Sequence, residues 1–497
     1  MSTVRKVISN TGYLFLDSAV ITILGYLFWV ILGKMLVPES MGAYSTIMNI
    51  SLLITSFTAA GFARTGIKLI SEYSTKNQKK HVSGFIRWSF KWSTVLNVIV
   101  GVLLVVYMFF IPFFNYLTVP IVTGIILYIA VNIYYILTSN YLVGLQNIKL
   151  LFKTNLISYI LKVILAIVFI YFGFDYYGAL GAFLVSAVIA VLLRVKKIPF
   201  SPGKIDKDRL KKYWKSSTIL DMSMLAMNSA NVFILSLFTD FYSVGIFTFA
   251  FMFSAAIRMI PTAIATSILP TGSSQVALNK FHNLKMIISR AIKYSFVILL
   301  PIITFLYIFS EKLIILFSST SYIESAFTMQ ILLLGAIFIG FSIIISFALY
   351  SIGNLKDSRN ILLLGAVINI LMTLWLAKEY SFIGAATSFS VSSFIMFLLS
   401  WYYLKNKLKI NFPCGQFTKV FFSAVLCGLI VFFLFGYAPR TVYIPLFAIV
   451  YFGVYSIMIR MFSIFDKRDK EFVLELEDKV PKKLLKHFRK FIDFYFK

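Results

Sequence analysis

The stretch Arg194–Lys215, RVKKIPFSPGKIDKDRLKKYWK, is the longest polar run inside the chain. It holds nine basic residues against two aspartates, together with two prolines and a glycine. Such a composition favours a solvated linker over a packed element. On both sides the sequence returns at once to apolar runs, six before the linker and eight after it, each long enough for a helix to cross a bilayer. We therefore predict fourteen spans, numbered in chain order, between about residues 11 and 461.

Positive charge lies almost entirely on one side of this series of spans. The 47 Lys and Arg residues fall at the N-terminus, in the even-numbered loops or in the C-terminal tail, with few exceptions. The exceptions in the odd-numbered loops are Lys34, Lys312, Lys378 and Arg440, and those inside spans are Lys162 and Arg258. Cytoplasmic loops retain Lys and Arg during insertion. The bias predicts a multi-pass protein of the plasma (cytoplasmic) membrane with both termini in the cytoplasm.

Composition supports this fold class and argues against others. A 60% hydrophobic content and a mean hydropathy of +0.88 exceed what a soluble domain buries. Lipid offers backbone groups no water, and the runs are too long for barrel strands, so we expect an all-α protein. The net charge of +28 does not predict nucleic-acid binding, because it is spread over short loops beside the membrane, where anionic lipids attract it.

Residues that carry chemistry in enzymes are sparse. The cysteines and histidines have no spacing typical of a disulfide framework, a metal site or a catalytic triad: Cys414, Cys427, His81, His282 and His487. Acidic residues in the external loops stand singly, and those loops are short: Glu39, Asp175, Asp240, Glu311, Glu324 and Glu379. We expect no cofactor and no enzyme activity. We expect the protein to transport or bind a ligand rather than to catalyse a reaction.

The two halves repeat. Gly42-Ala43-Tyr44-Ser45 opens span 2 and Gly245-Ile246-Phe247-Thr248 opens span 8, at an offset that also carries Gly181-Ala182 onto Gly384-Ala385. An even number of spans per half makes the repeat parallel, which is a transporter architecture. We predict a six-helix bundle over 1–195, a basic linker over 196–215, a second six-helix bundle over 216–410, an extra hairpin of spans 13 and 14 over 411–463, and a basic amphipathic cytoplasmic tail over 464–497 that lies on the inner leaflet.

Three basic residues are candidates for binding an anionic headgroup. Arg258 lies more than two turns inside span 8, three residues before Pro261, and guanidinium grips phosphate oxygens bidentately. Its other interpretation is an ion pair with Asp221 or Asp17. Lys162 lies about two turns into span 5, where its ammonium either serves a cavity or reaches back to the inner surface. Arg64, at the cytoplasmic end of span 2, is either a headgroup ligand or a topogenic charge.

A polar set lies on spans 1 and 7. Asp17 has Asp221 as its counterpart in the repeat, and Asp221, Asn228 and Asn231 share one face of span 7. Such a stripe is costly against lipid, so we expect it to face the cleft between the halves or a neighbouring helix. Ion or proton coupling is one use of these residues. Hydrogen bonding between helices and compensation of helix-end charge are the others.

Short motifs resemble the multidrug/oligosaccharidyl-lipid/polysaccharide exporter superfamily, in its polysaccharide-transporter branch. Leu36-Val-Pro-Glu-Ser-Met-Gly-Ala-Tyr44 resembles the branch's turn between spans 1 and 2, and Val244–Ala250 resembles the second-half turn. Leu269-Pro270 and Gly384-Ala385-Ala386 resemble the end of span 8 and the entry to span 12. The resemblance implies two six-helix bundles that rock about a central cavity. Members often carry an acidic residue in the middle of span 7, where this chain has asparagines.

The resemblance implies a flippase that moves a lipid-linked oligosaccharide on a polyprenyl-phosphate-type carrier from the inner to the outer leaflet. The pathway served would be surface polysaccharide or glycoprotein biosynthesis, and the expected partners are the lipid-linked glycan, membrane lipids and glycan-assembly enzymes. A cation-coupled multidrug exporter of the same superfamily is the first alternative. A membrane-embedded glycan transferase or polymerase is the second, and the short external loops disfavour it.

Overall fold

The computed structural model describes residues 3–59, 61–110, 118–206, 208, 210, 214, 218, 229–411, 414–437, 441–465 and 469. These residues form helices, turns and loops, and none of them lies in a β-strand. They divide into two compact units. The first contains Met1–Ala256, Phe317–Thr328 and Leu362–Ser392, and the second contains Ile257–Leu316, Met329–Ile361 and Ser393–Lys497.

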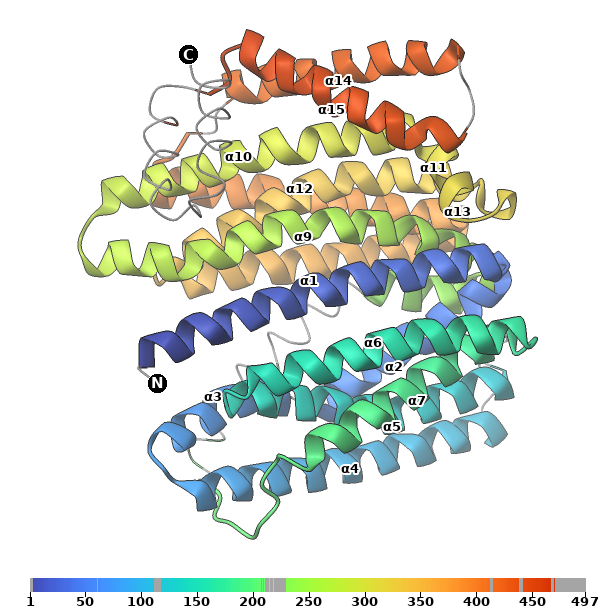
Figure 1. The fold of residues 1–497 in the computed structure, drawn as a ribbon, viewed down its shortest axis with the longest axis vertical. Coiled ribbons are helices and arrows are strands. Elements are labelled where there is room, and N and C mark those ends of the chain that lie inside the picture. Colours follow the sequence, from blue (N-terminus) through green and yellow to red (C-terminus); the bar gives the residue numbers. More distant parts are fainter. Residues whose placement is uncertain are drawn as a thin grey trace. The chain divides into compact units, whose positions relative to one another are not determined.

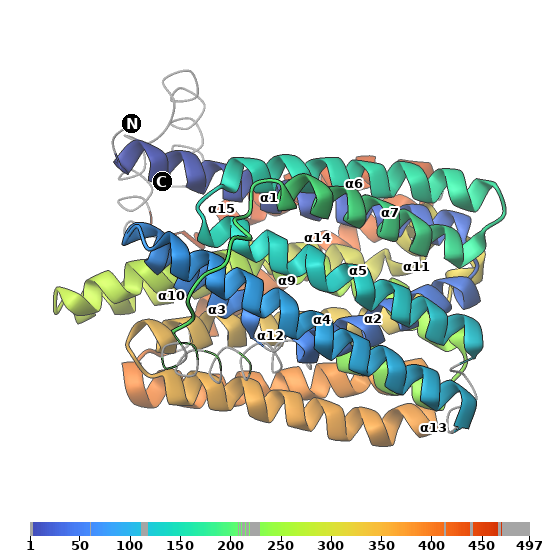
Figure 2. The ribbon, with the colours of Figure 1, turned by 90° about the horizontal axis from the view of Figure 1, so that it is seen from below.

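The first unit is built around α5. Its helices are α1 (Thr3–Met35), α2 (Pro38–Ala59), α3 (Phe62–Thr75), α4 (Lys79–Phe110), α5 (Val119–Gly144), α6 (Ile148–Tyr171), α7 (Asp175–Val195) and the beginning of α9 (Phe241–Ala277). The helix α5 packs against α2, α3, α4 and α7, while α6 lies between α7 and α1 (Figures 1 and 2). Gly61, with φ of 71°, makes the turn between α2 and α3, since glycine adopts this left-handed conformation without strain.

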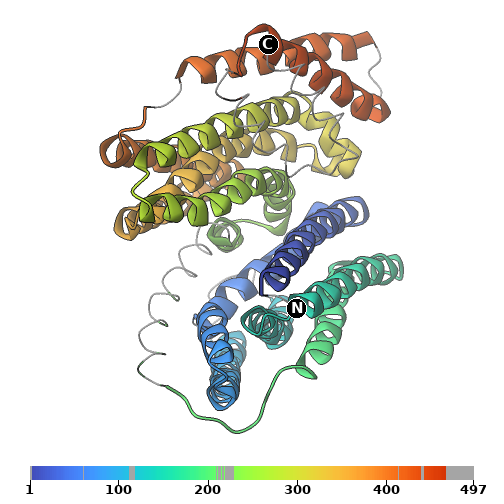
Figure 3. The same cartoon turned by 60° about the vertical axis from the view of Figure 1, so that its left-hand side comes forward.

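The second unit includes the C-terminal hairpin. It contains α10 (Phe281–Ile308), α11 (Ser310–Phe317), most of α12 (Ser325–Ser351), both ends of α13 (Leu355–Tyr403), the π-helix Leu404–Leu408, α14 (Cys414–Tyr437) and α15 (Ile444–Met461). The helices α14 and α15 pack against each other and against α10, as Figure 3 shows in orange and red above the yellow-green α10.

The chain after α15 is held against α10 by a buried ion pair. The Lys293 ammonium donates to Asp469, and the Tyr294 hydroxyl donates to the other Asp469 oxygen over 2.9 Å. Both charged side chains are buried, and Phe465 packs near Tyr294. The predicted amphipathic tail helix lies outside the described residues.

The all-helical membrane fold predicted from the sequence is confirmed. Eleven helices of the described part are long and apolar enough to cross a bilayer. One of them, α13, contains spans 11 and 12, which meet at Ser381 with φ of 50°. The 22-residue α2 and the helical residues Ser229–Phe238 correspond to spans 2 and 7. Within the described residues, helical segments therefore occur at each of the fourteen predicted spans, span 7 being described only over Ser229–Phe238. The boundaries of the predicted bundles, linker and tail stay a prediction.

Polar and apolar side chains are distributed as the bilayer requires. Many serines, threonines and asparagines are buried, whereas large apolar side chains are exposed along the helices, including Trp375, Phe433 and Ile449. Exposed apolar surface on this scale would be an interaction surface in a soluble protein. Here lipid tails solvate it, while the polar groups find hydrogen-bond partners inside the helical packing.

Candidate functional site

The repeated motifs meet face to face in the first unit, where α2 begins beside the beginning of α9. A Cβ placed on Gly42 would lie 1.8 Å from the carbonyl oxygen of Phe241, and one on Gly245 would lie 1.9 Å from that of Pro38. The two contacts are equivalent under the repeat, because each residue lies 203 positions from its counterpart, as Ser45 and Thr248 also do. Only glycine allows two backbones to approach this closely. We call this contact the crossing.

Hydrogen bonds extend the crossing. One turn further along, the Thr248 hydroxyl donates to Ser45 Oγ over 3.0 Å, and both residues are buried. The end of α1 is tied in as well. The Tyr322 hydroxyl donates to the Leu36 carbonyl over 3.1 Å, and Lys34 Nζ donates to the Ser318 carbonyl over 2.5 Å. These residues lie at the ends of spans, or in the segment between α10 and α12, on the side that the charge bias assigns to the outside.

Near the middle of α1, Asp17 is held by an asparagine of α6. The Asn155 amide donates to both Asp17 oxygens, over 2.9 and 3.1 Å, and both side chains are buried. The Asn155 carbonyl oxygen in turn accepts hydrogen bonds from Arg194, over 2.6 Å, and from the Tyr135 hydroxyl, over 3.0 Å. One amide therefore bridges a carboxylate and a guanidinium, so the charge of each is compensated inside the bundle.

Arg194 is the centre of this network, and sequence reasoning missed it. Its side chain is fully buried, although the sequence placed it at the border of the basic linker. Besides Asn155, its guanidinium donates to Thr154 Oγ1 over 3.0 Å, to Ser139 Oγ over 2.7 Å and to the Tyr135 carbonyl over 3.1 Å. The network joins α1, α5, α6 and α7. The only signal in the sequence was that Arg194 falls within the last turn of span 6 rather than beyond it.

Lys162 lies further along the interface between α6 and α1. Its ammonium lies 4.2 Å from the centroid of the Phe28 ring and 4.4 Å from that of Tyr159. Both distances are within the range of cation–π attraction. The side chain thus points into the packing of α6 on α1 rather than back towards the beginning of α6, which is about 20 Å away along the helix. Of the two interpretations, the geometry favours an ammonium kept inside the bundle.

Arg258 belongs to the second unit and is buried, with 9% of its surface exposed. It follows the beginning of α9 by 17 residues, which is about 26 Å along the helix. Pro261 lacks the N–H that the Ile257 carbonyl would accept. In the next turn the Thr262 hydroxyl donates to the Arg258 carbonyl over 2.8 Å. Pro261 thus leaves the Ile257 carbonyl without its usual backbone donor, while Thr262 adds a side-chain hydrogen bond to the neighbouring Arg258 carbonyl.

Asn231 forms a second polar clamp. Its side-chain oxygen accepts from Asn369 over 2.6 Å and from the Thr373 hydroxyl over 3.2 Å, and Ser392 donates to Asn369 over 3.3 Å. This clamp joins spans 7 and 11, which the repeat relates to spans 1 and 5, where Asp17 meets Asn155. Both clamps have the same sequence separation of 138 residues. The buried amide nitrogen of Asn231 has no partner in the described part of the chain.

Three other predicted site residues lie wholly or partly outside the described part of the chain. Asp221 and Asn228 lie outside the described residues, and so does the side chain of Arg64, whose backbone belongs to α3. The predicted polar face of span 7 is therefore visible only at Asn231.

Comparison with known proteins places the chain in a family. The profile of the family described as polysaccharide biosynthesis protein matches residues 7–276, which is more than half of the chain, and the MatE profile matches residues 219–375. The chain is 26% identical to the uncharacterized membrane protein MJ1375 of Methanocaldococcus jannaschii, over 76% of this chain and 92% of that protein.

Two further relatives have functional names. The probable low-salt glycan biosynthesis flippase Agl15 of Haloferax volcanii is 20% identical over 57% of this chain and 60% of its own length. The probable lipid II flippase MurJ of Buchnera aphidicola is 22% identical over 77% of this chain and 80% of its own length.

Solved structures show the same fold. The inward closed conformation of the lipid II flippase MurJ aligns with a TM-score of 0.72 and 18% identity, over 92% of this chain and 98% of that one. An inward-facing multidrug resistance MATE transporter aligns with a TM-score of 0.65 and 17% identity, over 78% and 94%. The chain belongs to the polysaccharide biosynthesis protein family, within the multidrug/oligosaccharidyl-lipid/polysaccharide exporter superfamily, and is a transporter rather than an enzyme.

Proposed function

We propose that this protein is a flippase that moves the polar headgroup of a lipid-linked glycan from the inner to the outer leaflet of the cytoplasmic membrane. The named relatives are flippases, one for glycan biosynthesis and one for lipid II, and the family profile is that of polysaccharide biosynthesis. The carrier is of the polyprenyl-phosphate type. Membrane lipids and glycan-assembly enzymes are its partners, and both termini lie in the cytoplasm.

The observation that carries the proposal is positive charge held within the helical packing of spans. Arg258 lies well inside α9, and the ammonium of Lys162 lies between two aromatic rings within α6 and α1 packing. An ionised residue in the middle of a span costs about 2.5–3.5 kcal/mol on insertion scales. A phosphate-bearing headgroup offsets this cost when it is bound. Arg258 is assigned to grip the phosphate bidentately, and Lys162 to attract it as a point charge.

Arg64 completes the proposed set of cations, at the cytoplasmic end of span 2, where the headgroup enters. The lipid tail stays in the bilayer, because only transfer of the polar glycan headgroup through hydrocarbon costs a large free energy. A sugar hydroxyl that loses its hydrogen bonds on entering an apolar phase costs roughly 2–7 kcal/mol. A path lined by serine, threonine and asparagine side chains removes most of that penalty.

The crossing supplies the external closure in this mechanism. The beginnings of α2 and α9 are in backbone contact there. In the proposed mechanism this contact closes the outer end, and the substrate enters from the cytoplasmic end. Export then requires the crossing to separate. The Asp17 and Asn231 clamps hold first and fifth helices of each repeat together, which allows each group of helices to move as a body.

A cation-coupled multidrug exporter is the second candidate, because the MatE profile matches 219–375. In that case Asp17, Asp221, Asn228 and Asn231 would serve ion coupling rather than helix packing. Resistance profiling separates the two functions. Overexpression that raises resistance to several unrelated cationic drugs supports drug export, whereas unchanged resistance together with glycan export supports the flippase.

The direct test uses purified protein in liposomes that contain a polyprenyl-pyrophosphate-linked disaccharide with a fluorescent sugar. A membrane-impermeant quencher reports how much of the sugar has crossed. Arg258→Gln should slow transfer by at least tenfold, and Arg258→Lys should retain part of the rate. The control is Arg460→Gln, which removes an exposed charge at the end of α15. Transfer at the wild-type rate in Arg258→Gln would remove this residue from the mechanism.

A further inference from the structure

The beginning of the central linker is docked on the first turn of α4. The Lys204 amide donates to the Lys80 carbonyl over 3.1 Å, and the Ser201 hydroxyl donates to Ser83 Oγ over 3.0 Å. The backbones touch beside these bonds: a Cβ on Gly203 would lie 2.0 Å from the Lys80 carbonyl oxygen. This part of the linker is therefore fixed to the first unit, and it brings Lys204 next to the α3–α4 turn.

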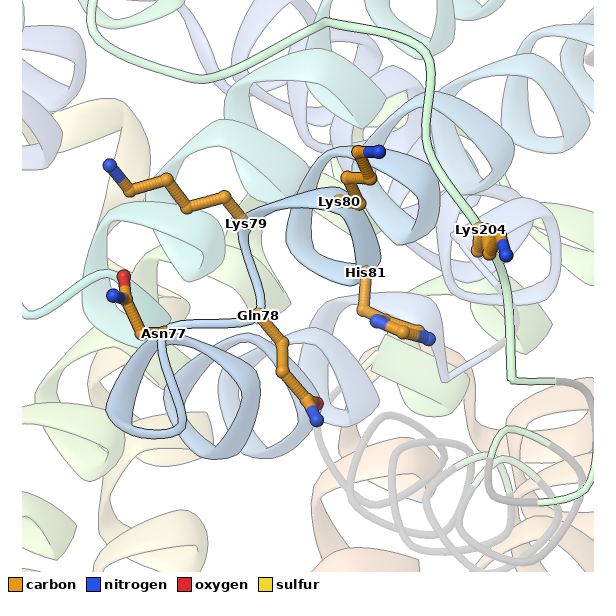
Figure 4. Close-up of a pocket in the computed structure, with 6 residues that line it drawn as sticks. All are labelled: Asn77, Gln78, Lys79, Lys80, His81 and Lys204. Carbon is orange, nitrogen blue, oxygen red and sulfur yellow. The ribbon is translucent and has the colours of Figure 1, made fainter.

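Docking creates an open basin of about 500 Å³ at this turn, which we call the basic basin. The residues that line it are Asn77, Gln78, Lys79, Lys80, His81 and Lys204. Figure 4 shows Lys80, His81 and Lys204 on one side of the turn, with Lys79 and Asn77 extending on the other. Two segments more than a hundred residues apart thus contribute basic side chains to one concave surface.

The lining is one-sided in charge. It consists of three lysines, a histidine and two amides, and none of these six residues is acidic. Glu72, one turn before the basin, pairs with Lys76 over 3.1 Å. Like charges gathered on one surface repel each other, more strongly the closer they lie. A fixed contact that gathers like charges is expected where a bound anion offsets this repulsion.

The position of the basin indicates what kind of anion can reach it. Lys80 precedes Trp88 by eight residues on α4, which is about 12 Å along the helix. Tryptophan is enriched at the membrane–water interface. With the interface near Trp88, the basin lies in or beyond the headgroup layer, within reach of phosphate groups from the cytoplasm and of headgroups that project from the membrane. Ammonium groups bind phosphate oxygens by charge-assisted hydrogen bonds.

We propose that the basic basin is a binding site for a phosphate-bearing anion on the cytoplasmic face, with Lys80 and Lys204 as its principal ligands and His81 as a further donor. The site is separate from Arg258 and Lys162 and stands whether or not those residues bind a transported headgroup. Its ligand is the phosphate of a soluble diphosphate or of a membrane lipid.

The experiment uses the full chain in nanodiscs of phosphatidylcholine, titrated with sodium pyrophosphate and followed by intrinsic fluorescence and thermal unfolding. A second arm replaces part of the lipid with phosphatidylglycerol. The test variant is Lys80→Gln with Lys204→Gln, which leaves the backbone hydrogen bond between these residues in place. The control variant is Lys149→Gln with Lys153→Gln, which removes two exposed charges at the beginning of α6.

Wild-type protein and the control variant should bind pyrophosphate saturably with Kd values within twofold of each other, and the test variant should bind at least tenfold more weakly. Stabilisation by phosphatidylglycerol that is lost only in the test variant would assign the phosphate to a lipid. The absence of any effect of either probe on the wild-type protein would overturn the proposal. So would an equal loss of binding in both variants, because binding would then be a property of diffuse surface charge.

Discussion

Alanine at Gly42 or Gly245 tests the crossing with the smallest possible change. A Cβ at Gly42 would lie 1.8 Å from a backbone oxygen, and one at Gly245 would lie 1.9 Å from another, so the two helices would have to part by more than about 1 Å. Neither oxygen can move alone, since each belongs to a helix. Overpacking of this kind typically costs about 1–3 kcal/mol, which corresponds to a roughly 5- to 150-fold shift in an equilibrium.

The assay measures how readily the outside reaches the crossing. Ser45 is fully buried there, so a cysteine at this position should react slowly with a membrane-impermeant maleimide added outside. The reaction is run with Cys414→Ser, because Cys414 is an exposed native thiol. Adding Gly42→Ala or Gly245→Ala should raise the labelling rate of Ser45→Cys by about tenfold, as expected for roughly 1.4 kcal/mol.

Gly101→Ala is the matched control. A Cβ at Gly101, in α4, meets no atom within 4 Å. Gly101→Ala should leave the labelling rate of Ser45→Cys unchanged. It should also stabilise α4 by about 0.5–1 kcal/mol, because alanine has a higher helix propensity than glycine. Equal labelling rates in all three alanine variants would refute the reasoning that the crossing closes the outer end.

Three further predictions concern buried charge. Arg194→Leu should destabilise the first unit by about 3–5 kcal/mol, because it leaves Asp17 uncompensated; the measurement is thermal unfolding in detergent, and an unchanged Tm would contradict it. Lys162→Met should fold normally but slow sugar transfer severalfold, whereas Lys162→Arg should keep most of the wild-type rate. Equal transfer rates for Lys162→Met and the wild type would show that the ammonium takes no part in transfer. Asp469→Ala should cost about 3–5 kcal/mol by stranding Lys293, and the double variant Asp469→Ala with Lys293→Met should recover most of it; additive losses would show that the two side chains act independently.

Hydrophobic run length and charge bias predicted the helical membrane fold because both are local properties of the sequence. A span needs about 20 apolar residues wherever it lies in the chain, and Lys and Arg orient it through the loops. The repeat was also readable, since Gly42 and Gly245 open their spans at the same place. That these two glycines touch was not predicted. A contact between the two repeats depends on how their helices pack against each other. The spacing of residues along one helix does not specify that packing.

Among the candidate residues, too, those with a local signal in the sequence could be predicted, and those that depend on contacts between helices could not. Lys162 and Arg258 could be chosen as candidates because an ionisable side chain in an apolar run is conspicuous. Arg194 was missed because a positive charge at the cytoplasmic end of a span is the ordinary case. Its burial depends on Asn155 and Ser139, two neutral residues on other helices. The docking of Lys204 on α4 was equally invisible, because linker composition predicts solvation rather than a specific contact.

The central claim is that export requires the outer crossing to open and close. The most direct measurement is sugar transfer by Ser45→Cys with Thr248→Cys in liposomes, before and after oxidation, since the two native hydroxyl oxygens are already 3.0 Å apart. The account predicts that oxidation stops transfer and that a reductant restores it, with Cys414→Ser as the background. Full transfer by protein shown to be cross-linked would contradict it.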